Sequence, residues 1–264
     1  MLKSISFIIP CAGKGSRLSI PSAKELLPVD YNTTLIDCVF NNLKNYKYKA
    51  NFIFIISKEK TDLIKYLSKY SDNYDIYFVY QKSNKKDLLG AIESAENLFS
   101  EKNILILPDI LLLDDSIYLK IDDYIKLLDK NIDLSILDYC EFSDSKKEKL
   151  GNVKYDENEN ILGIIDKPTN HTILQNENSF CWVSLGFRSD KVFEFYNIFK
   201  QIQIKDKYVD LEKNKINAKS IHIRNAIDLG VWDNIRLFHS QYEYYINLEK
   251  VCGRDYLHFN KKDI

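Results

Sequence analysis

The feature that most constrains this chain is the alternation of short apolar runs with helix-patterned segments through its first 140 residues. Apolar runs bounded by polar turns predict strands, and segments whose apolar residues recur every three or four positions predict helices. The predicted strands are 4–10, 51–57, 74–81, 103–108 and 132–140, and the predicted helices are 33–46, 60–70, 85–100 and 116–130. Apolar strands separated by helices indicate a mostly parallel sheet that is covered on both faces. We therefore predict a doubly wound α/β fold.

Beyond residue 150 the pattern becomes richer in strands. We expect a hairpin, a strand, a helix, a late strand that enters a loop, and a final helix, at residues 151–168, 179–189, 190–199, 220–230 and 231–248, respectively. The hairpin contains the polar turn "DENEN", which is typical of a short connection between strands. No Pro/Gly/Ser-rich linker and no internal repeat divides the chain. We therefore predict a single domain over residues 1–264, with a β-rich insertion.

Composition excludes several classes of protein. The formal net charge is −1, from 37 basic and 38 acidic residues, whereas proteins that grip nucleic acid normally carry a basic excess. No stretch approaches the roughly 20 apolar residues of a membrane helix, and the N-terminus shows no signal-peptide pattern. The five cysteines are scattered without a CxxC pair, and the four histidines have no metal-ligand spacing. We expect a protein of a reducing, cytoplasmic compartment, without zinc, that contacts neither a membrane nor nucleic acid.

The stretch "IIPCAGKGSRLSIPSAKELLPV" at residues 8–29 joins the first predicted strand to a glycine-containing loop. Glycines at the carboxyl end of a strand expose backbone N–H groups to which phosphates can bind. The spacing is neither GxGxxG nor that of a P-loop. Taken alone, the loop is therefore either a phosphate cradle or a strand–helix turn with surface cations.

The pattern "AGKGSRL…AKELLPV" resembles the signature AGxGTRL…PKxLLPV of nucleotidyltransferases that activate sugar 1-phosphates. Other segments resemble motifs of that family in the same order. These are "YQ" at 80–81, "LLGAIESAENLF" at 88–99, "ILILPDILL" at 104–112, "IIDKP" at 164–168 and "AIDLGVWDNI" at 226–235. The resemblance implies a Rossmann-like sheet with a nucleotide-binding half (1–140), a sugar-phosphate half (141–235), and a C-terminal helix and tail (236–264).

The implied reaction is attack of a sugar 1-phosphate oxygen on the α-phosphorus of a nucleoside triphosphate, with release of pyrophosphate. Such a reaction needs phosphates that are aligned and charge that is neutralised. The resemblance assigns Arg17 to the triphosphate and pyrophosphate, Lys24 to the α-phosphate, and Lys167 to the sugar phosphate. Arg17 suits its role because its guanidinium offers a bidentate fork.

Two aspartates match the metal pair of the family. Asp109 ends an apolar strand, and Asp228 follows the late strand. Carboxylates at such positions suit Mg²⁺, a hard ion that prefers oxygen ligands. The alternative for Asp109 is a helix cap, which Asp114 or Asp115 could provide instead.

The remaining candidates contact the nucleotide or the sugar by resemblance. The nucleotide-binding residues are Ala12, Gly13, Lys14, Gly15, Gln81 and Gly90, and the sugar-phosphate-binding residues are Gly151, Asp166, Lys167 and Trp182. Gln81 can present a donor and an acceptor to a pyrimidine edge. Gly90 lies in a helical pattern, where glycine costs about 1 kcal/mol, and close approach of a base or ribose would explain it. Trp182 is equally compatible with a core position.

Two departures from the family pattern bear on the substrate. Arg17 and Lys24 are seven positions apart, a shorter gap than in most glucose-1-phosphate uridylyl- and thymidylyltransferases, and Ala23 replaces the usual proline. UTP or dTTP is the expected donor. The alternatives are a cytidylyltransferase that acts on another sugar or polyol phosphate, and an inactive nucleotide-binding homologue. The expected role is nucleotide-sugar biosynthesis for cell-surface polysaccharide. The identity of the sugar and the oligomeric state stay open.

Overall fold

The computed structural model describes residues 5–20, 22–29, 32–43, 46, 49–114, 117–129, 132–141, 144–169 and 179–240. The strands are β1 Ile5–Pro10, β2 Ala50–Ile56, β3 Asp75–Tyr80, β4 Lys102–Ile106, β5 Ile110–Leu113, β6 Leu134–Tyr139, β7 Gly151–Tyr155, β8 Ile161–Asp166, β9 Ser179–Arg188, β10 Val209–Asp210, β11 Ala218–Ile223 and β12 Asn225–Asp228. The α-helices are α1 Leu35–Leu43, α2 Thr61–Leu67, α3 Leu88–Ser94, α4 Ile117–Leu127, α5 Asp144–Lys147 and α7 Val192–Ile202, and residues 232–240 are also helical. No described helix combines the length and the apolar character needed to cross a lipid bilayer.

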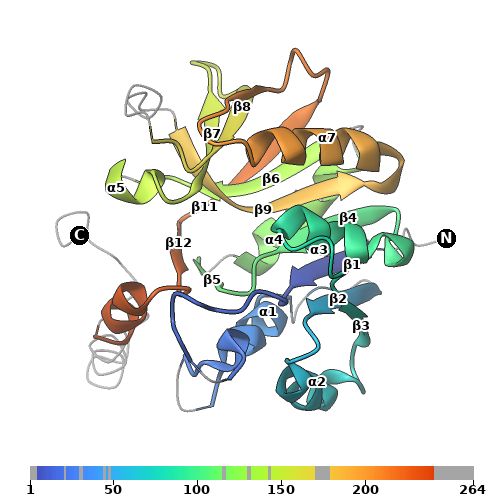
Figure 1. The fold of residues 1–264 in the computed structure, drawn as a ribbon. Helices are drawn as coiled ribbons and strands as arrows, with labels where there is room; N and C mark the ends of the chain where they lie inside the picture. The colour runs from blue at the N-terminus through green and yellow to red at the C-terminus, as the bar shows by residue number, and fades with distance from the viewer. Residues whose placement is uncertain are drawn as a thin grey trace.

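The central sheet has ten strands and two kinds of pairing. Strands β3, β2, β1 and β4 are neighbours and run parallel, as do β6 and β11. The long strand β9 joins the two groups, because it pairs antiparallel with β4, β6 and β7. Strands β7, β8 and β10 complete an antiparallel region at the other end, drawn at the top of Figure 1. The parallel end of the sheet therefore holds the N-terminal half of the chain, and the antiparallel end holds the insertion.

Helices cover both faces of this sheet. One core contains the inward side chains of α1, α2 and α4, and the other contains those of α3 and α7. Strand β1 serves both cores, because Phe7 and Ile9 lie in the first and Ile8 in the second, and all three are completely buried. Alternation of side chains along a strand places successive residues on opposite faces. The prediction of a doubly wound α/β fold is confirmed.

Several predicted elements differ from those observed. The predicted strand 220–230 is two strands, β11 and β12, which belong to different sheets. The predicted helices 60–70, 85–100 and 116–130 are α-helical only as far as Leu67, Ser94 and Leu127. The predicted helix 33–46 begins at Leu35 and ends at Leu43, and residues 44 and 45 lie outside the described residues. The predicted strand 103–108 ends at Ile106, after which β5 turns away to pair antiparallel with β12 in a separate two-stranded sheet. The final helix is described only as far as residue 240.

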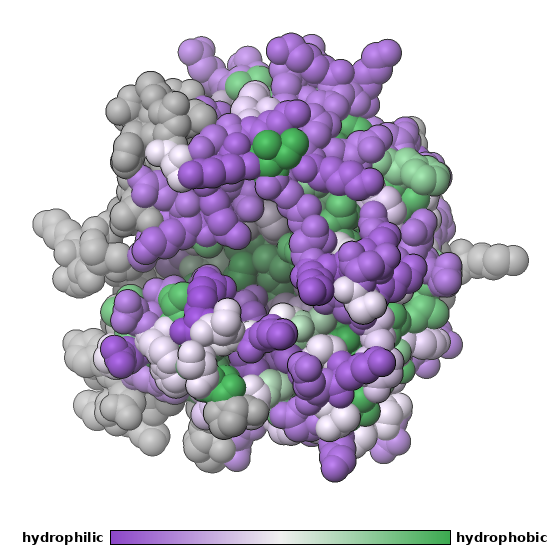
Figure 2. All heavy atoms as spheres, in the orientation of Figure 1, coloured by the Kyte–Doolittle hydropathy of each residue, from purple (hydrophilic) through white to green (hydrophobic). Residues whose placement is uncertain are grey.

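The small β5–β12 sheet matters for function because of where it lies. It brings the turn after β4 beside the end of β12, although more than 100 residues of sequence separate them. Figure 2 shows a hollow between the two halves of the molecule, with apolar residues on its floor. In Figure 1, β5 and β12 lie beside this same region. In parallel sheets, ligands bind beyond the carboxyl ends of the strands, and Gly13, Gln81 and Asp109 follow the carboxyl ends of β1, β3 and β4.

Candidate active site

The loop of residues 11–20, here called the signature loop, leaves the carboxyl end of β1. Gly15 has a φ of +62°, a left-handed conformation that glycine adopts without strain, and two backbone N–H groups further along donate to its carbonyl. A Cβ atom on Gly13 would meet no atom within 4 Å. Ala12 is half-buried and Lys14 is exposed. The four residues predicted to cradle phosphate therefore form an open turn beyond the sheet.

Lys24 and Asp109 form an ion pair between the segment after this loop and the turn after β4. Lys24 opens the short 3₁₀ helix η1, Lys24–Leu26. Its Nζ is hydrogen-bonded to Asp109 Oδ2, and the two side chains are only 15% and 16% exposed. Burial alone would lower the pKa of Lys24, but the charge and hydrogen bond of Asp109 outweigh burial and raise it. Asp109 is not a helix cap, because α4 starts only at Ile117.

Arg17 and Asp228 form a second, more open pair beside the first. Arg17 Nη1 lies 3.6 Å from Asp228 Oδ2, and the arginine side chain is 59% exposed. The backbone N–H of Leu229 donates to the Asp109 carbonyl at 2.8 Å, which ties the two aspartate-bearing turns together. A Cβ built on Gly230 would lie 2.8 Å from Asp228 Oδ1, 2.9 Å from Arg17 Nη2 and 3.1 Å from Asp109 Oδ2. The three charged groups therefore converge around a glycine that has no side chain to separate them.

The two carboxylates also influence each other. Burial is the main cause that raises the pKa of Asp228, and the nearby charge of Asp109 raises it further, while Arg17 and Lys24 oppose the rise. Like charges in one site favour the binding of a cation between them. A cation bound between Asp109 and Asp228 would therefore reduce the repulsion between their carboxylates, which Arg17 and Lys24 offset only in part.

The predicted sugar-phosphate residues lie at the end of the β7–β8 hairpin. Gly151 and Asp166 face each other across the two strands, and Lys167 follows with a φ of +45°. Lys167 Nζ is 3.7 Å from Asp166 Oδ2, and its side chain is 66% exposed. Burial raises the pKa of Asp166, and Lys167 offsets that rise only in part. Trp182 is buried against Gly151, where a Cβ would lie 1.9 Å from the indole nitrogen.

The predicted base-reading residues belong to a loop that is ordered by its own hydrogen bonds. Gln81 Nε2 donates to the carbonyls of Lys85, at 2.6 Å, and Asp87, at 2.9 Å. Asp87 caps α3 by accepting from the Gly90 N–H at 2.6 Å. A Cβ on Gly90 would lie only 2.5 Å from Lys85 Cβ, so the close neighbour of this glycine in the structure is Lys85. The sequence did not predict this packing inside the loop.

The sequence profile of the nucleotidyl transferase family matches residues 7–242. The chain belongs to this family. The match includes every position that we assigned to the site, from the signature loop to Asp228. The predicted nucleotidyltransferase activity is therefore confirmed at the level of the family. No curated protein sequence matches the chain significantly.

Solved structures share the fold of this nucleotidyl transferase. UDP-glucose pyrophosphorylase from Acinetobacter baumannii has a TM-score of 0.72 and 16% identity, over 95% of this chain and 100% of its own. A putative glucose-1-phosphate thymidylyltransferase from Bacillus anthracis in complex with sucrose has a TM-score of 0.68 and 17% identity, over 90% and 94%. A UDP-glucose pyrophosphorylase complexed with UDP-glucose has a TM-score of 0.72 and 18% identity, over 93% and 100%. At these identities the likeness shows a common fold.

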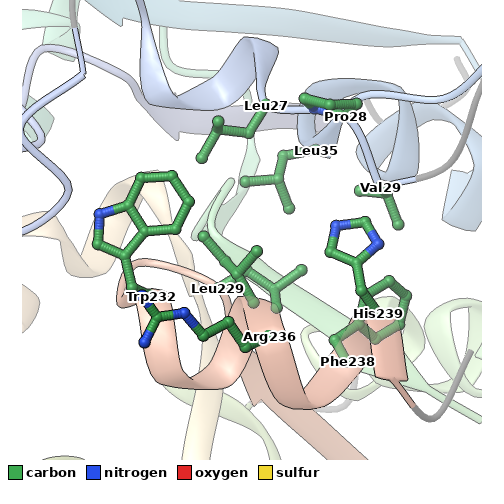
Figure 3. Close-up of a pocket in the computed structure, with 10 residues that line it drawn as sticks. Leu27, Pro28, Val29, Leu35, Leu229, Trp232, Arg236, Phe238 and His239 are labelled. Carbon is green, nitrogen blue, oxygen red and sulfur yellow. The ribbon is translucent and has the colours of Figure 1, made fainter.

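Sequence reasoning missed contacts that hold this nucleotidyl transferase site together. Gly230 lies where Arg17, Asp109 and Asp228 converge. The sequence indicated it only as the glycine of "DLG" in the late motif. Trp232 Nε1 donates to the Leu18 carbonyl at 3.0 Å, which fastens the helix after Gly230 to the signature loop. The buried residues Val29, Leu35, Leu229 and Phe238 form a small apolar cluster beside this contact. These four residues and Trp232 line part of a pocket with a volume of about 670 Å³. Figure 3 shows how its lining side chains lie.

One histidine has an acidic partner that its position in the sequence did not reveal. His222 on β11 and Asp138 on β6 are register partners, and His222 Nδ1 lies 2.6 Å from Asp138 Oδ1. Tyr155 also donates to the same buried carboxylate. The hydrogen bond between His222 and Asp138 raises the pKa of His222. The pair lies on the paired strands of the sheet rather than among the charged groups of the site.

Asp109 and Asp228 are the candidate metal ligands. Within the described part of the chain, no group of three or more His, Cys, Asp or Glu side chains is arranged to hold a metal ion by itself. Mg²⁺ is commonly held by one or two carboxylates, with water and substrate phosphates completing its shell. The neighbouring carboxylates of Asp109 and Asp228 fit that ion, provided that a triphosphate is bound beside them.

Proposed function

We propose that this enzyme transfers a nucleotidyl group from UTP or dTTP to a sugar 1-phosphate and releases pyrophosphate. The observation that carries the proposal is the convergence of Arg17, Asp109 and Asp228 around Gly230, with Lys24 paired to Asp109. Two solved structures with this fold are named UDP-glucose pyrophosphorylase and glucose-1-phosphate thymidylyltransferase, which favours a sugar 1-phosphate as the acceptor.

Each cation has a separate task in this reaction. A sugar-phosphate oxygen forms a bond to the α-phosphorus, and the bond between that phosphorus and the bridging oxygen breaks. Lys24 neutralises the α-phosphate as the bond forms, and the Arg17 fork holds the departing pyrophosphate. Lys167 holds the sugar phosphate on the opposite side. Because Arg17 is largely exposed, its guanidinium can leave Asp228 for a phosphate at little cost.

Mg²⁺ completes the proposal. Asp109 and Asp228 would hold it, and the ion would neutralise phosphate charge when it is bound. The same two carboxylates also pair with Lys24 and Arg17, and so keep these cations where the triphosphate is proposed to bind. We propose that nucleotidyl transfer depends on this ion.

The preference for UTP or dTTP is supported by Gln81. Both hydrogens of its Nε2 are used by carbonyls of its own loop, so its Oε1 remains as an acceptor. An acceptor fits the N3–H of uracil or thymine, whereas cytosine presents an acceptor at the same position. We place the activity in the cytoplasm, where the buried thiols of Cys11 and Cys181 stay reduced.

Pyrophosphate release over a grid of nucleoside triphosphates and sugar or polyol phosphates tests the proposal. We expect turnover with UTP or dTTP and a hexose 1-phosphate, and loss of turnover when EDTA removes divalent ions. Turnover only with CTP would assign the enzyme to the cytidylyltransferases. Nucleotide binding without turnover on any pair would make it an inactive homologue.

A further inference from the structure

Directly behind Lys24 lies an ion pair that the reaction does not use. Lys60 Nζ donates to both carboxylate oxygens of Glu25, at 2.9 and 2.7 Å. Glu25 is completely buried, and Lys60 is only 7% exposed. Glu25 is the residue after Lys24 on η1, and Lys60 immediately precedes α2. The pair therefore connects the segment that carries Lys24 to a helix of the core.

Stability does not explain this pair. Removal of two charges from water is expensive, and apolar residues of similar volume are often as stable or more stable. Burial raises the pKa of Glu25, although the charge and hydrogen bonds of Lys60 oppose the rise. The Cys11 thiol, which lies near Glu25, is also completely buried. The surroundings of the Glu25 carboxylate are therefore shielded from water. A pair of directional hydrogen bonds is, in contrast, well suited to fixing the orientation of a backbone segment.

The backbone around Lys24 is held at a second point by the same helix. Asp62, in the first turn of α2, accepts a hydrogen bond from the Ala23 N–H at 3.2 Å. Lys24 and Glu25 are adjacent residues of one tight turn, and their side chains go to Asp109 and Lys60, respectively. Any rotation of the turn that released Glu25 would therefore also displace the Lys24 ammonium.

We propose that Glu25 and Lys60 are positioning residues that fix where the Lys24 ammonium meets the phosphate of the nucleotide. This inference rests on the proposed function, because it assigns Lys24 to a phosphate. Glu25 and Lys60 do not touch the substrate in this scheme. They act by keeping η1 in one orientation on α2, so that the position of Lys24 is set before the substrate binds. A displacement of about 1 Å in such a group can lower a rate by roughly 100-fold.

Kinetics of variants of the pair test this role. We expect Lys60→Met to lower kcat by roughly 10- to 100-fold and to raise the KM for the nucleotide by about fivefold, because the displaced ammonium binds the phosphate more weakly and stabilises the transition state less. The KM for the sugar 1-phosphate should stay within about threefold. Lys60→Arg keeps a charged bidentate donor and should restore most of kcat. The double variant Glu25→Leu/Lys60→Met removes the buried charges together. We expect it to melt near the wild-type temperature and yet to stay slow.

The matched control is Lys102→Met. Lys102 is 5% exposed and lies 2.6 Å from Asp129 Oδ2, but it begins β4 at the end of the sheet away from the site. Its loss should lower the melting temperature and leave kcat unchanged. If Lys102→Met lowered kcat as much as Lys60→Met, or if the double variant had wild-type kcat, the positioning role would be overturned.

A binding measurement separates this inference from the proposed function. If the wild type showed no turnover on the whole substrate grid, the proposed reaction would fail. The affinity for inorganic tripolyphosphate still reports on Lys24 in that case. Lys60→Met and the double variant should then bind tripolyphosphate at least about fivefold more weakly, whereas Lys102→Met should bind it normally. Equal binding by all variants would contradict the positioning role.

Discussion

The two halves of the candidate site differ in how firmly their charges are held. On the nucleotide side, Lys24 is buried against Asp109, and the buried pair of Glu25 and Lys60 lies directly behind it. On the sugar side, Lys167 is 66% exposed, and its neighbour Asp166 lies 3.7 Å away. The first set of residues comes from segments that follow three different strands, β1, β2 and β4, and the second comes from one hairpin end.

This difference indicates that the charged groups proposed for the two substrates are ordered to different extents before binding. Charged groups that are fixed before binding stabilise a transition state without reorganisation. On the proposed nucleotide side Lys24 is held in this way, whereas Arg17 is 59% exposed. In the proposed reaction, the exposed Lys167 must become ordered when the sugar phosphate arrives, which costs side-chain entropy. Changes on the nucleotide side should therefore lower kcat, and changes on the sugar side should raise a single KM.

The largest expected effect is that of Asp109→Asn. The amide keeps the shape of the side chain but removes the charge that holds Lys24 and the proposed ligand of Mg²⁺. We expect kcat to fall by roughly 100- to 1000-fold, with an unchanged circular dichroism spectrum. Asp233→Asn is the control, because Asp233 is 94% exposed and contacts only the exposed Arg236 at 3.7 Å among the ion pairs described. Near-normal turnover of Asp109→Asn would refute the metal assignment.

A smaller effect is expected of Lys167→Met. In the proposed reaction, loss of this ammonium removes a charge-assisted hydrogen bond to the sugar phosphate but leaves the proposed nucleotide side intact. The KM for the sugar 1-phosphate should rise by about tenfold, and the KM for the nucleotide should not change. Steady-state kinetics with each substrate varied in turn measures both. Lys219→Met, at an exposed position on β11, controls for the change in net charge. A rise in the KM for the nucleotide instead would show that Lys167 contacts the nucleotide and not the sugar phosphate.

The smallest effect on catalysis is expected from Asp37, on α1. Burial alone would raise the pKa of this carboxyl, but hydrogen bonds from two tyrosines and Thr34, with the Lys69 ammonium, outweigh burial and hold it at about 2. A pKa below that of the unfolded chain stabilises the fold at every pH above about 4, and this stability disappears as the pH falls through about 2. Asp37→Asn should therefore lower the free energy of unfolding by about 2 kcal/mol at pH 7 and leave kcat unchanged.

Denaturant titrations at pH 7 and at pH 3 measure this dependence. The difference between the wild type and Asp37→Asn should shrink at the lower pH. Asp72→Asn, at an exposed position, should match the wild type at both. A constant difference would show that Asp37 contributes through its shape and hydrogen bonds alone, without its charge.

The sequence predicted the proposed site residues that lie at strand ends and in short motifs. Arg17, Lys24, Asp109 and Asp228 were all predicted, and the structure brings them together because β5 pairs with β12. Nothing local in the sequence predicts that pairing, since the predicted strand ends at residue 108 and residues 110–113, which form β5, were assigned to no strand. The limit is physical, because the break after Ile106 is decided by a partner strand that arrives more than 100 residues later.

Buried polar contacts were beyond the reach of the sequence for a related reason. Glu25 and Lys60 are 35 positions apart and look like ordinary surface charges, because charged residues are almost always exposed unless they are paired. Gln81 was predicted to be a base-reading residue, but its hydrogen bonds to the carbonyls of its own loop depend on the path of that loop, which the sequence does not show. Patterns along the chain report which face a residue occupies. They do not report which distant residue it meets there.

The hydrogen bond between Trp232 and the Leu18 carbonyl has an optical consequence. The chain contains two tryptophans, of which Trp182 is buried and Trp232 is 41% exposed. The indole of Trp232 is attached to the backbone of the loop that is proposed to receive the triphosphate. The fluorescence emission of Trp232 should therefore change when the conformation of that loop changes, so that the enzyme needs no added fluorescent label.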